Sequence, residues 1–166
     1  MFVDYLTLML INLVAGLFLL AGLLAWGLDA DDRRKWAPGF AMAGLIALAC
    51  GLHMAWTWPL PGSYNILFGE SSALFGTVCL GVALGLGMNR RLTSVALYGV
   101  FAALAAIVLG AGVLHRGMTQ SPTFAGPAFL VTGVGALSFC AAVLLRSVRV
   151  LRWIAAAALV IAAVMW

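Results

Sequence analysis

The sequence predicts an all-α, polytopic integral membrane protein, folded as a six-helix transmembrane bundle with both termini on the extracytoplasmic side. Three observations predict this fold: the composition, the number of long apolar runs and the positions of the basic residues between them. Of the 166 residues, 65% are hydrophobic and 8% are charged, whereas a soluble domain carries about 45–50% apolar and roughly 25% charged residues. The composition therefore excludes a water-soluble globule, a disordered chain and a nucleic-acid-binding domain.

Each expected helix ends at a short segment that combines charges, proline and glycine, as membrane spans do. In chain order these segments read DADDRRKWAPG, WPLPGSYN, MNRR, HRGMTQSPT and RSVR. A helical crossing needs about 20 apolar residues, so residues 1–166 form six spans in a single transmembrane domain. The expected helices cover about 3–28, 37–58, 66–88, 93–114, 123–145 and 150–166. The last is the shortest, and we expect Trp153 and Trp166 to anchor its ends at the two membrane interfaces.

The basic residues set the orientation of the bundle. Eight of the nine lie in three clusters between alternate pairs of apolar runs. They are Arg33, Arg34 and Lys35, then Arg90 and Arg91, then Arg146, Arg149 and Arg152. Because basic loops stay in the cytoplasm, we expect a multi-pass protein of the cell membrane with these loops inside. The net charge of +4 is then explained by the basic cytoplasmic loops. The expected partner is the lipid bilayer rather than a nucleic acid or a nucleotide.

Both histidines and two carboxylates fall on the outer side in this orientation. They are Asp4, His53, Glu70 and His115. The short connection 59–65 makes the second and third helices antiparallel neighbours, so His53 and Glu70 can face each other. At a rise of about 1.5 Å per residue, both lie roughly 7–9 Å below the outer interface, and ionisable residues at such depth are costly and often functional. A buried amide, Asn12 on the first helix, is expected to hydrogen-bond a neighbouring helix.

Three interpretations of this outer set stay open. In the first, the four residues hold a transition metal such as copper, iron, manganese or zinc, since imidazole and carboxylate from neighbouring helices are the ligands of bundle metal sites. In the second, His53 and His115 are the axial ligands of a b-type haem. In the third, Glu70 hydrogen-bonds His53 or caps the third helix, and the set only locks the structure.

No sequence motif identifies a reaction. The chain lacks the GxSxG, Walker A, HExxH and Rossmann glycine patterns, so whether it is an enzyme stays open. We expect a small membrane protein with a metal site near its extracytoplasmic face. The alternative is a non-catalytic accessory subunit of a larger membrane complex, or a homo-oligomer, which packs through small residues on the third and fourth helices. These residues are Gly81, Gly85, Ala102, Ala106 and Gly110.

The second and fourth expected helices end alike. Leu52-His53 precedes Pro61, and Leu114-His115 precedes Pro122. This likeness predicts a weak internal repeat of about 62 residues, of the kind that membrane proteins often contain.

Two stretches carry a resemblance to a known family. The segment TWPLPGSYNILFGESSALFG, residues 57–76, and the amino-terminal MFVDYLTLMLINL resemble an uncharacterised prokaryotic family of polytopic membrane proteins, the domain-of-unknown-function family 981. The likeness covers most of the chain, and its most specific part runs from Tyr64 to Glu70. The resemblance implies an integral membrane fold and draws attention to Glu70, and it implies no particular activity.

Overall fold

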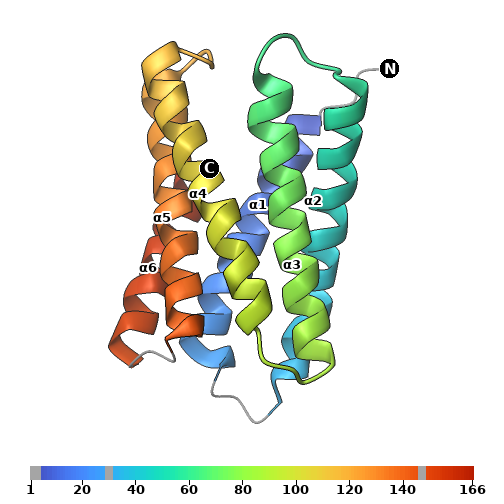
Figure 1. The fold of residues 1–166 in the computed structure, drawn as a ribbon, viewed down its shortest axis with the longest axis vertical. Helices are drawn as coiled ribbons and strands as arrows, with labels where there is room; N and C mark the ends of the chain where they lie inside the picture. The colour runs from blue at the N-terminus through green and yellow to red at the C-terminus, as the bar shows by residue number, and fades with distance from the viewer. Residues whose placement is uncertain (1–4, 29–31, 146–148) are drawn as a thin grey trace.

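A computed structural model describes residues 5–28, 32–145 and 149–166 of the chain, and it confirms the predicted all-helical fold (Figure 1). Its six α-helices are α1 (Tyr5–Gly22), α2 (Ala37–Thr57), α3 (Ser71–Gly87), α4 (Thr93–Arg116), α5 (Pro122–Leu144) and α6 (Arg149–Met165). The first helix is followed, and the second and third are preceded, by a short segment whose turns are tighter or wider than those of an α-helix. These segments are the π-helix η1 (Leu23–Gly27) after α1, the 3₁₀ turn η2 (Arg33–Trp36) before α2 and the π-helix η3 (Asn65–Glu70) before α3.

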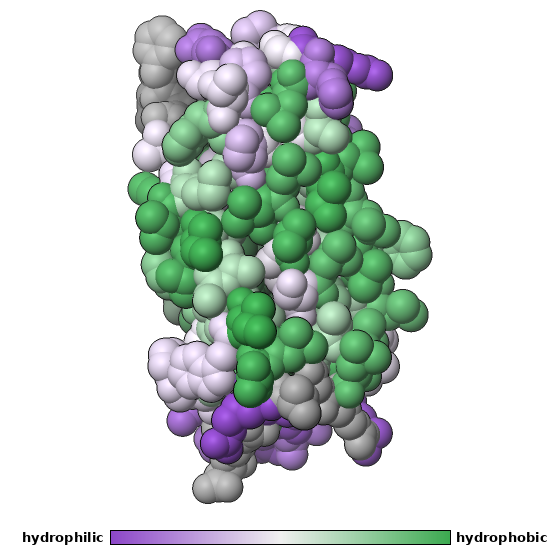
Figure 2. Space-filling view, turned by 90° about the vertical axis from the view of Figure 1, so that its left-hand side faces the viewer, coloured by the Kyte–Doolittle hydropathy of each residue, from purple (hydrophilic) through white to green (hydrophobic). Residues whose placement is uncertain are grey.

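Within the described residues, five helices are long and apolar enough to cross a membrane. They cover Leu6–Gly27, Arg33–Thr57, Asn65–Gly87, Thr93–Arg116 and Pro122–Leu144. On the face shown in Figure 2, hydrophobic residues form a broad band between hydrophilic residues at the two ends. A band of this kind is how a protein matches the hydrocarbon core of a bilayer. The chain therefore has the surface of a multi-pass membrane protein.

The helix α6 is shorter than each of the five candidate membrane spans. Its 17 residues give a length of about 26 Å, against about 36 Å for the 24 residues of α4. The expectation that Trp166 anchors this helix at the outer interface is wrong. The indole of Trp166 lies inside the bundle, where its Nε1–H donates to Thr132 Oγ1 at 2.9 Å and its ring packs edge-on against Phe129. Because α6 begins at the level of the basic loops, its length brings Trp166 only part of the way across (Figure 1).

The helices form a closed ring. Each helix packs against its neighbours in the chain, and α6 packs back against α1. The predicted antiparallel pairing of α2 with α3 is confirmed, and α4 and α5 form a second antiparallel hairpin beside it (Figure 1). Asn12 joins α1 to α2 as expected, because its buried Nδ2–H donates to the Ala43 carbonyl at 2.8 Å.

Glycines bring the backbones of α2 and α3 into direct contact. A Cβ atom added at Gly51 would lie 2.5 Å from the Ala73 nitrogen, and one added at Gly76 would lie 2.5 Å from the Leu48 nitrogen. Real Cβ atoms do not approach backbone this closely, so no larger residue fits at either position without moving a helix. Close approach at small residues is a main source of helix association in membranes, where the hydrophobic effect between helices is absent.

The hairpin of α4 and α5 repeats the same contacts. A Cβ atom at Gly110 would lie 2.9 Å from the Gly126 carbonyl oxygen, and one at Gly133 would lie 2.8 Å from the Ala103 carbonyl oxygen. The equivalent positions in the two hairpins are Gly51 and Gly110, Gly69 and Gly126, Ala73 and Leu130, and Gly76 and Gly133. The offset is therefore 59 residues in the first helix of each hairpin and 57 in the second.

The ends of α2 and α4 carry the same cap, which fixes the register of this repeat. Trp58 and Gly117 both adopt the left-handed conformation, with φ of 50° and 61°, and their N–H groups donate to the carbonyls of Met54 and Val113. These pairs are also 59 residues apart. The predicted spacing of about 62 residues, which aligned the two histidines, is wrong by one helical turn. His53 corresponds to Gly112, not to His115.

The small residues expected to mediate packing do so within the chain. Gly81 lies against Val95 and Gly85 against Leu92, so both hold α3 to α4. Gly110 packs against α5, and Ala102 and Ala106 face a cavity inside the bundle. These positions are therefore not a free surface for a partner subunit.

Substitution of Gly51 tests the backbone contact. We expect Gly51→Ala to lower the free energy of unfolding by about 1–3 kcal/mol, the usual cost of overpacking. Gly112→Ala is the matched control, because a Cβ there would meet only Met118 Sδ at an ordinary 3.5 Å. Thermal unfolding of the purified protein in detergent measures both, and equal stability of the two variants would contradict the packing described here.

The orientation in the membrane is open to a labelling test. The loop with Arg90 and the turn with Arg33 lie at the same end of the bundle, where Arg33 Nη2 donates to Asn89 Oδ1 at 3.2 Å, and we expect this end in the cytoplasm. In a cysteine-free background, an impermeant thiol reagent applied to intact cells is expected to label Gln120→Cys and not Met88→Cys. Labelling of Met88→Cys alone would show that the protein has the opposite orientation in the membrane.

Candidate functional site

His53 and Glu70 lie on adjacent segments, as the sequence predicts. His53 is on α2 and Glu70 ends η3, and these segments cross where a Cβ atom at Gly69 would lie 3.2 Å from Met54 Cβ. Both side chains are exposed. Glu70 makes no capping hydrogen bond to α3, so the expectation that it caps this helix is wrong.

His115 and Asp4 are not brought to this crossing by any described contact. His115 is exposed in the last turn of α4, and the outer ends of α2 and α4 lie on opposite sides of the bundle (Figure 1). Asp4 lies outside the described residues. Within residues 5–28, 32–145 and 149–166, no three side chains of His, Cys, Asp or Glu lie close enough together to hold a metal ion. The four-residue metal site and the bis-histidine haem remain predictions.

The π-helix η3 decides which side chains face the bundle interior. A π-turn contains one residue more than an α-turn, so it shifts the faces of the residues around it relative to an unbroken α-helix. Here Glu70 is exposed, whereas Phe68 and Ser71 line a cavity inside the bundle. Sequence reasoning missed this cavity because hydropathy does not distinguish a π-turn from an α-turn.

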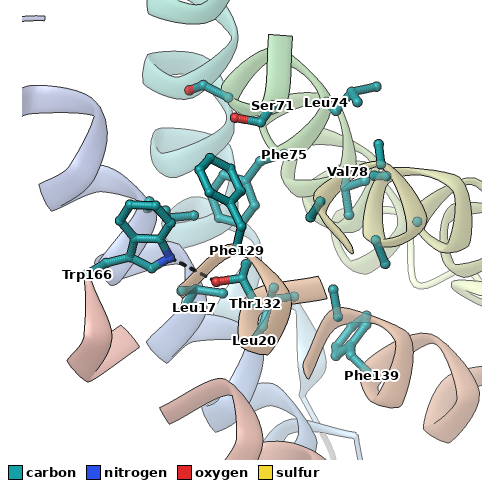
Figure 3. A pocket seen from close by; sticks show the side chains of 18 of the residues that line it. Leu17, Leu20, Ser71, Leu74, Phe75, Val78, Phe129, Thr132, Phe139 and Trp166 are labelled. Atoms are coloured by element: carbon teal, nitrogen blue, oxygen red, sulfur yellow. Dashed lines mark hydrogen bonds between the residues drawn. The ribbon is translucent and has the colours of Figure 1, made fainter. Parts of the chain in front are cut away.

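The cavity lies between the two hairpins and is completed by α1 and Trp166 (Figure 3). The volume that the centre of a water molecule can reach is about 100 Å³. Residues from two parts of the hydrophobic core line it. The larger part includes Leu20 and Phe139, and the smaller part consists of Leu67, Val113 and Phe129, nearer the outer loops.

Aromatic rings form much of the wall. The Trp166 ring meets Phe129 edge-on with centroids 5.0 Å apart and Phe68 edge-on at 6.3 Å. Phe75 also lines the cavity (Figure 3). The opposite wall is made by small residues of α4, namely Gly99, Ala102, Ala103, Ala105 and Ala106. The empty space therefore exists because small side chains on one helix face rings on the others.

Few polar atoms line the cavity. Trp166 donates to Thr132, whose own hydroxyl donates to the Ala128 carbonyl at 2.8 Å. Ser71 donates to the Leu67 carbonyl, and Ser72 donates across to the Ala47 carbonyl of α2 at 3.1 Å. None of the described residues that line the cavity is charged.

The outer loops above the cavity are tied together. Ser63 Oγ donates to the Met118 carbonyl at 3.0 Å, and the Gln120 N–H donates to the Tyr64 hydroxyl at 3.1 Å. Within the first loop, the fully buried Asn65 accepts from the Leu60 N–H at 3.0 Å. These bonds fix the two hairpins relative to each other at the outer end.

Comparison with known proteins gives a family without an assigned activity. A family model described as "Protein of unknown function (DUF981)" matches residues 1–166. No match was found among curated proteins or among solved structures.

The crossing of α2 with η3 predicts that His53 and Glu70 act together. We expect the effects of His53→Ala and Glu70→Gln on stability to be non-additive, because the two residues lie next to the point where their segments cross and effects at neighbouring sites often do not add. His115→Ala, on the other hairpin, is the control. Its effect on stability should be additive with that of Glu70→Gln. Thermal unfolding and metal content of the single and double variants measure this. Additive losses with unchanged metal content would remove the metal hypothesis.

Proposed function

We propose that this chain, which belongs to the DUF981 family of proteins of unknown function, binds a slender and largely apolar ligand within the bilayer. The observation that carries the proposal is the cavity between the two hairpins. Its walls come from α1, α3, α4 and α5, and binding sites in membrane proteins built from repeats commonly lie between the repeats.

The lining and the size of the cavity support the same class of ligand. Small-molecule sites are mostly apolar, with aromatic side chains and few polar groups. A cavity of roughly 150 Å³ accepts a benzene ring, so about 100 Å³ holds one unsaturated segment or the leading edge of a ring. The rest of a longer ligand would extend from the cavity into the surrounding lipid.

The choice of residues on α4 also supports a ligand. Protein interiors are close-packed, and an unfilled space forfeits dispersion contacts along its walls. Larger side chains at Ala102 or Ala106 would fill this one. Small residues opposite a wall of rings are expected where something else occupies the space.

Photo-crosslinking tests the proposal. Purified protein in lipid nanodiscs is irradiated with a lipid that carries a diazirine on its chain, and the labelled peptides are identified by mass spectrometry. We expect label on the α3 and α5 peptides that contain Phe75 and Phe129. Ala106→Phe, which fills the cavity, should reduce that label severalfold.

Val108→Phe is the matched control for this experiment. Val108 is on the same helix, but its side chain is 69% exposed on the outer surface, so the variant should leave labelling of the cavity unchanged. Equal labelling of the Ala106→Phe protein and the wild type would contradict the proposed site.

A further inference from the structure

The oxygen and nitrogen atoms of the side chains described in the cavity wall offer acceptors and no free N–H or O–H donor; the thiol of Cys140, also in the lining, is only a weak donor. Among the described residues that line it, the Trp166 N–H and the hydroxyl protons of Ser71, Ser72 and Thr132 all have acceptors within the protein. A hydroxyl oxygen whose proton is donated can still accept hydrogen bonds through its lone pairs. A ligand with only a carbonyl or ether oxygen therefore finds no N–H or O–H partner among these residues without breaking a bond of the protein.

Ser71 is the acceptor best placed for a ligand. Thr132 Oγ1 already accepts from Trp166, and Ser72 Oγ holds α3 to α2 through the Ala47 carbonyl. Among the described residues, Ser71 bonds to the turn that precedes it, at Leu67 and Phe68 of η3. It can therefore accept from a ligand without loosening a contact between helices.

The absence of charge among the described lining residues restricts the ligand further. An ionised phosphate, carboxylate or ammonium group would lose its hydration here without a counter-ion, which is prohibitive. The rings of Phe75, Phe129 and Trp166 (Figure 3) favour a flat, unsaturated group, because aromatic faces and edges pack well against π-systems. A neutral, unsaturated ligand that donates a hydrogen bond therefore fits this lining best.

We propose that the ligand is a neutral lipid with a hydroxyl group next to an unsaturated or aromatic segment, and that its O–H donates to Ser71 Oγ. This inference rests on the proposed function, since it names the ligand class of the same cavity. Two kinds of lipid share this chemistry: a prenyl alcohol, and a phenolic or hydroquinone ring on an apolar tail. Bulk phospholipid chains lack the donor.

Competition against the diazirine lipid tests the ligand class with two matched pairs of probes. Farnesol is compared with farnesyl methyl ether, and 4-nonylphenol with its methyl ether. In each pair the apolar part is kept and the donor is removed. We expect at least one hydroxyl compound to compete about three- to tenfold better than its ether, the effect of one net hydrogen bond. The pair that shows the difference identifies a prenyl alcohol or a phenolic ring.

Variants at two hydroxyl residues locate the bond. In the Ser71→Ala protein, the hydroxyl compound should compete only as well as its ether. Competition by the ether itself should stay as in the wild type. Thr77→Val is the control, because Thr77 donates to the preceding turn of the same helix and is exposed. Its preference for the hydroxyl compound should equal that of the wild type.

The failures of the two proposals are distinguishable. If the wild type carries no label that Ala106→Phe reduces, the cavity is not a binding site. Label that is sensitive to Ala106→Phe, with equal competition by alcohol and ether, would keep the site and overturn the hydroxyl ligand. If the Ser71→Ala protein still prefers the hydroxyl compound to its ether, Ser71 is not the acceptor, and the assignment of the bond to Ser71 is overturned.

Discussion

The contact on which the structure depends is the close approach of helix backbones at glycine, made twice. Gly51 and Gly76 bring α2 against α3, and Gly110 and Gly133 do the same for α4 and α5. In a bilayer the lipid is as apolar as the side chains, so tight packing rather than exclusion from water must hold the helices. Because each hairpin closes through its own glycines, the residues on the other faces of α3, α4 and α5 remain to enclose a space between the hairpins.

Two local features turn that space into a cavity. The π-helix η3 directs Phe68 and Ser71 inward while Glu70 is exposed, and the short α6 places the Trp166 indole against Thr132 and Phe129. Both features depart from a regular array of spanning α-helices. π-turns occur often at functional sites, and here the π-turn lies where the cavity meets the outer loops. The chemistry of the cavity therefore follows from irregular backbone, and the glycine contacts hold it in place.

The sequence predicted the helices well because apolar runs and charged breaks determine spans almost independently of tertiary structure. It also predicted that His53 and Glu70 lie on adjacent segments, since a short loop leaves little choice. It did not predict the role of Ser71 or Trp166. The orientation of Ser71 depends on one extra residue in a π-turn, and the position of Trp166 depends on how far α6 reaches, which composition does not specify. The register predicted for the repeat was wrong because the two Leu-His pairs are a more conspicuous likeness than the glycines that make the contacts.

The central claim is that the space between the hairpins is a binding site and not a packing defect. A crystal structure of the protein extracted with its native lipids and grown in a lipid phase tests this most directly. The account predicts one continuous, elongated density between Phe75, Phe129 and Trp166, with its polar end within hydrogen-bonding distance of Ser71 Oγ. A cavity closed by movement of α4 onto the aromatic wall, with no density inside, would contradict it.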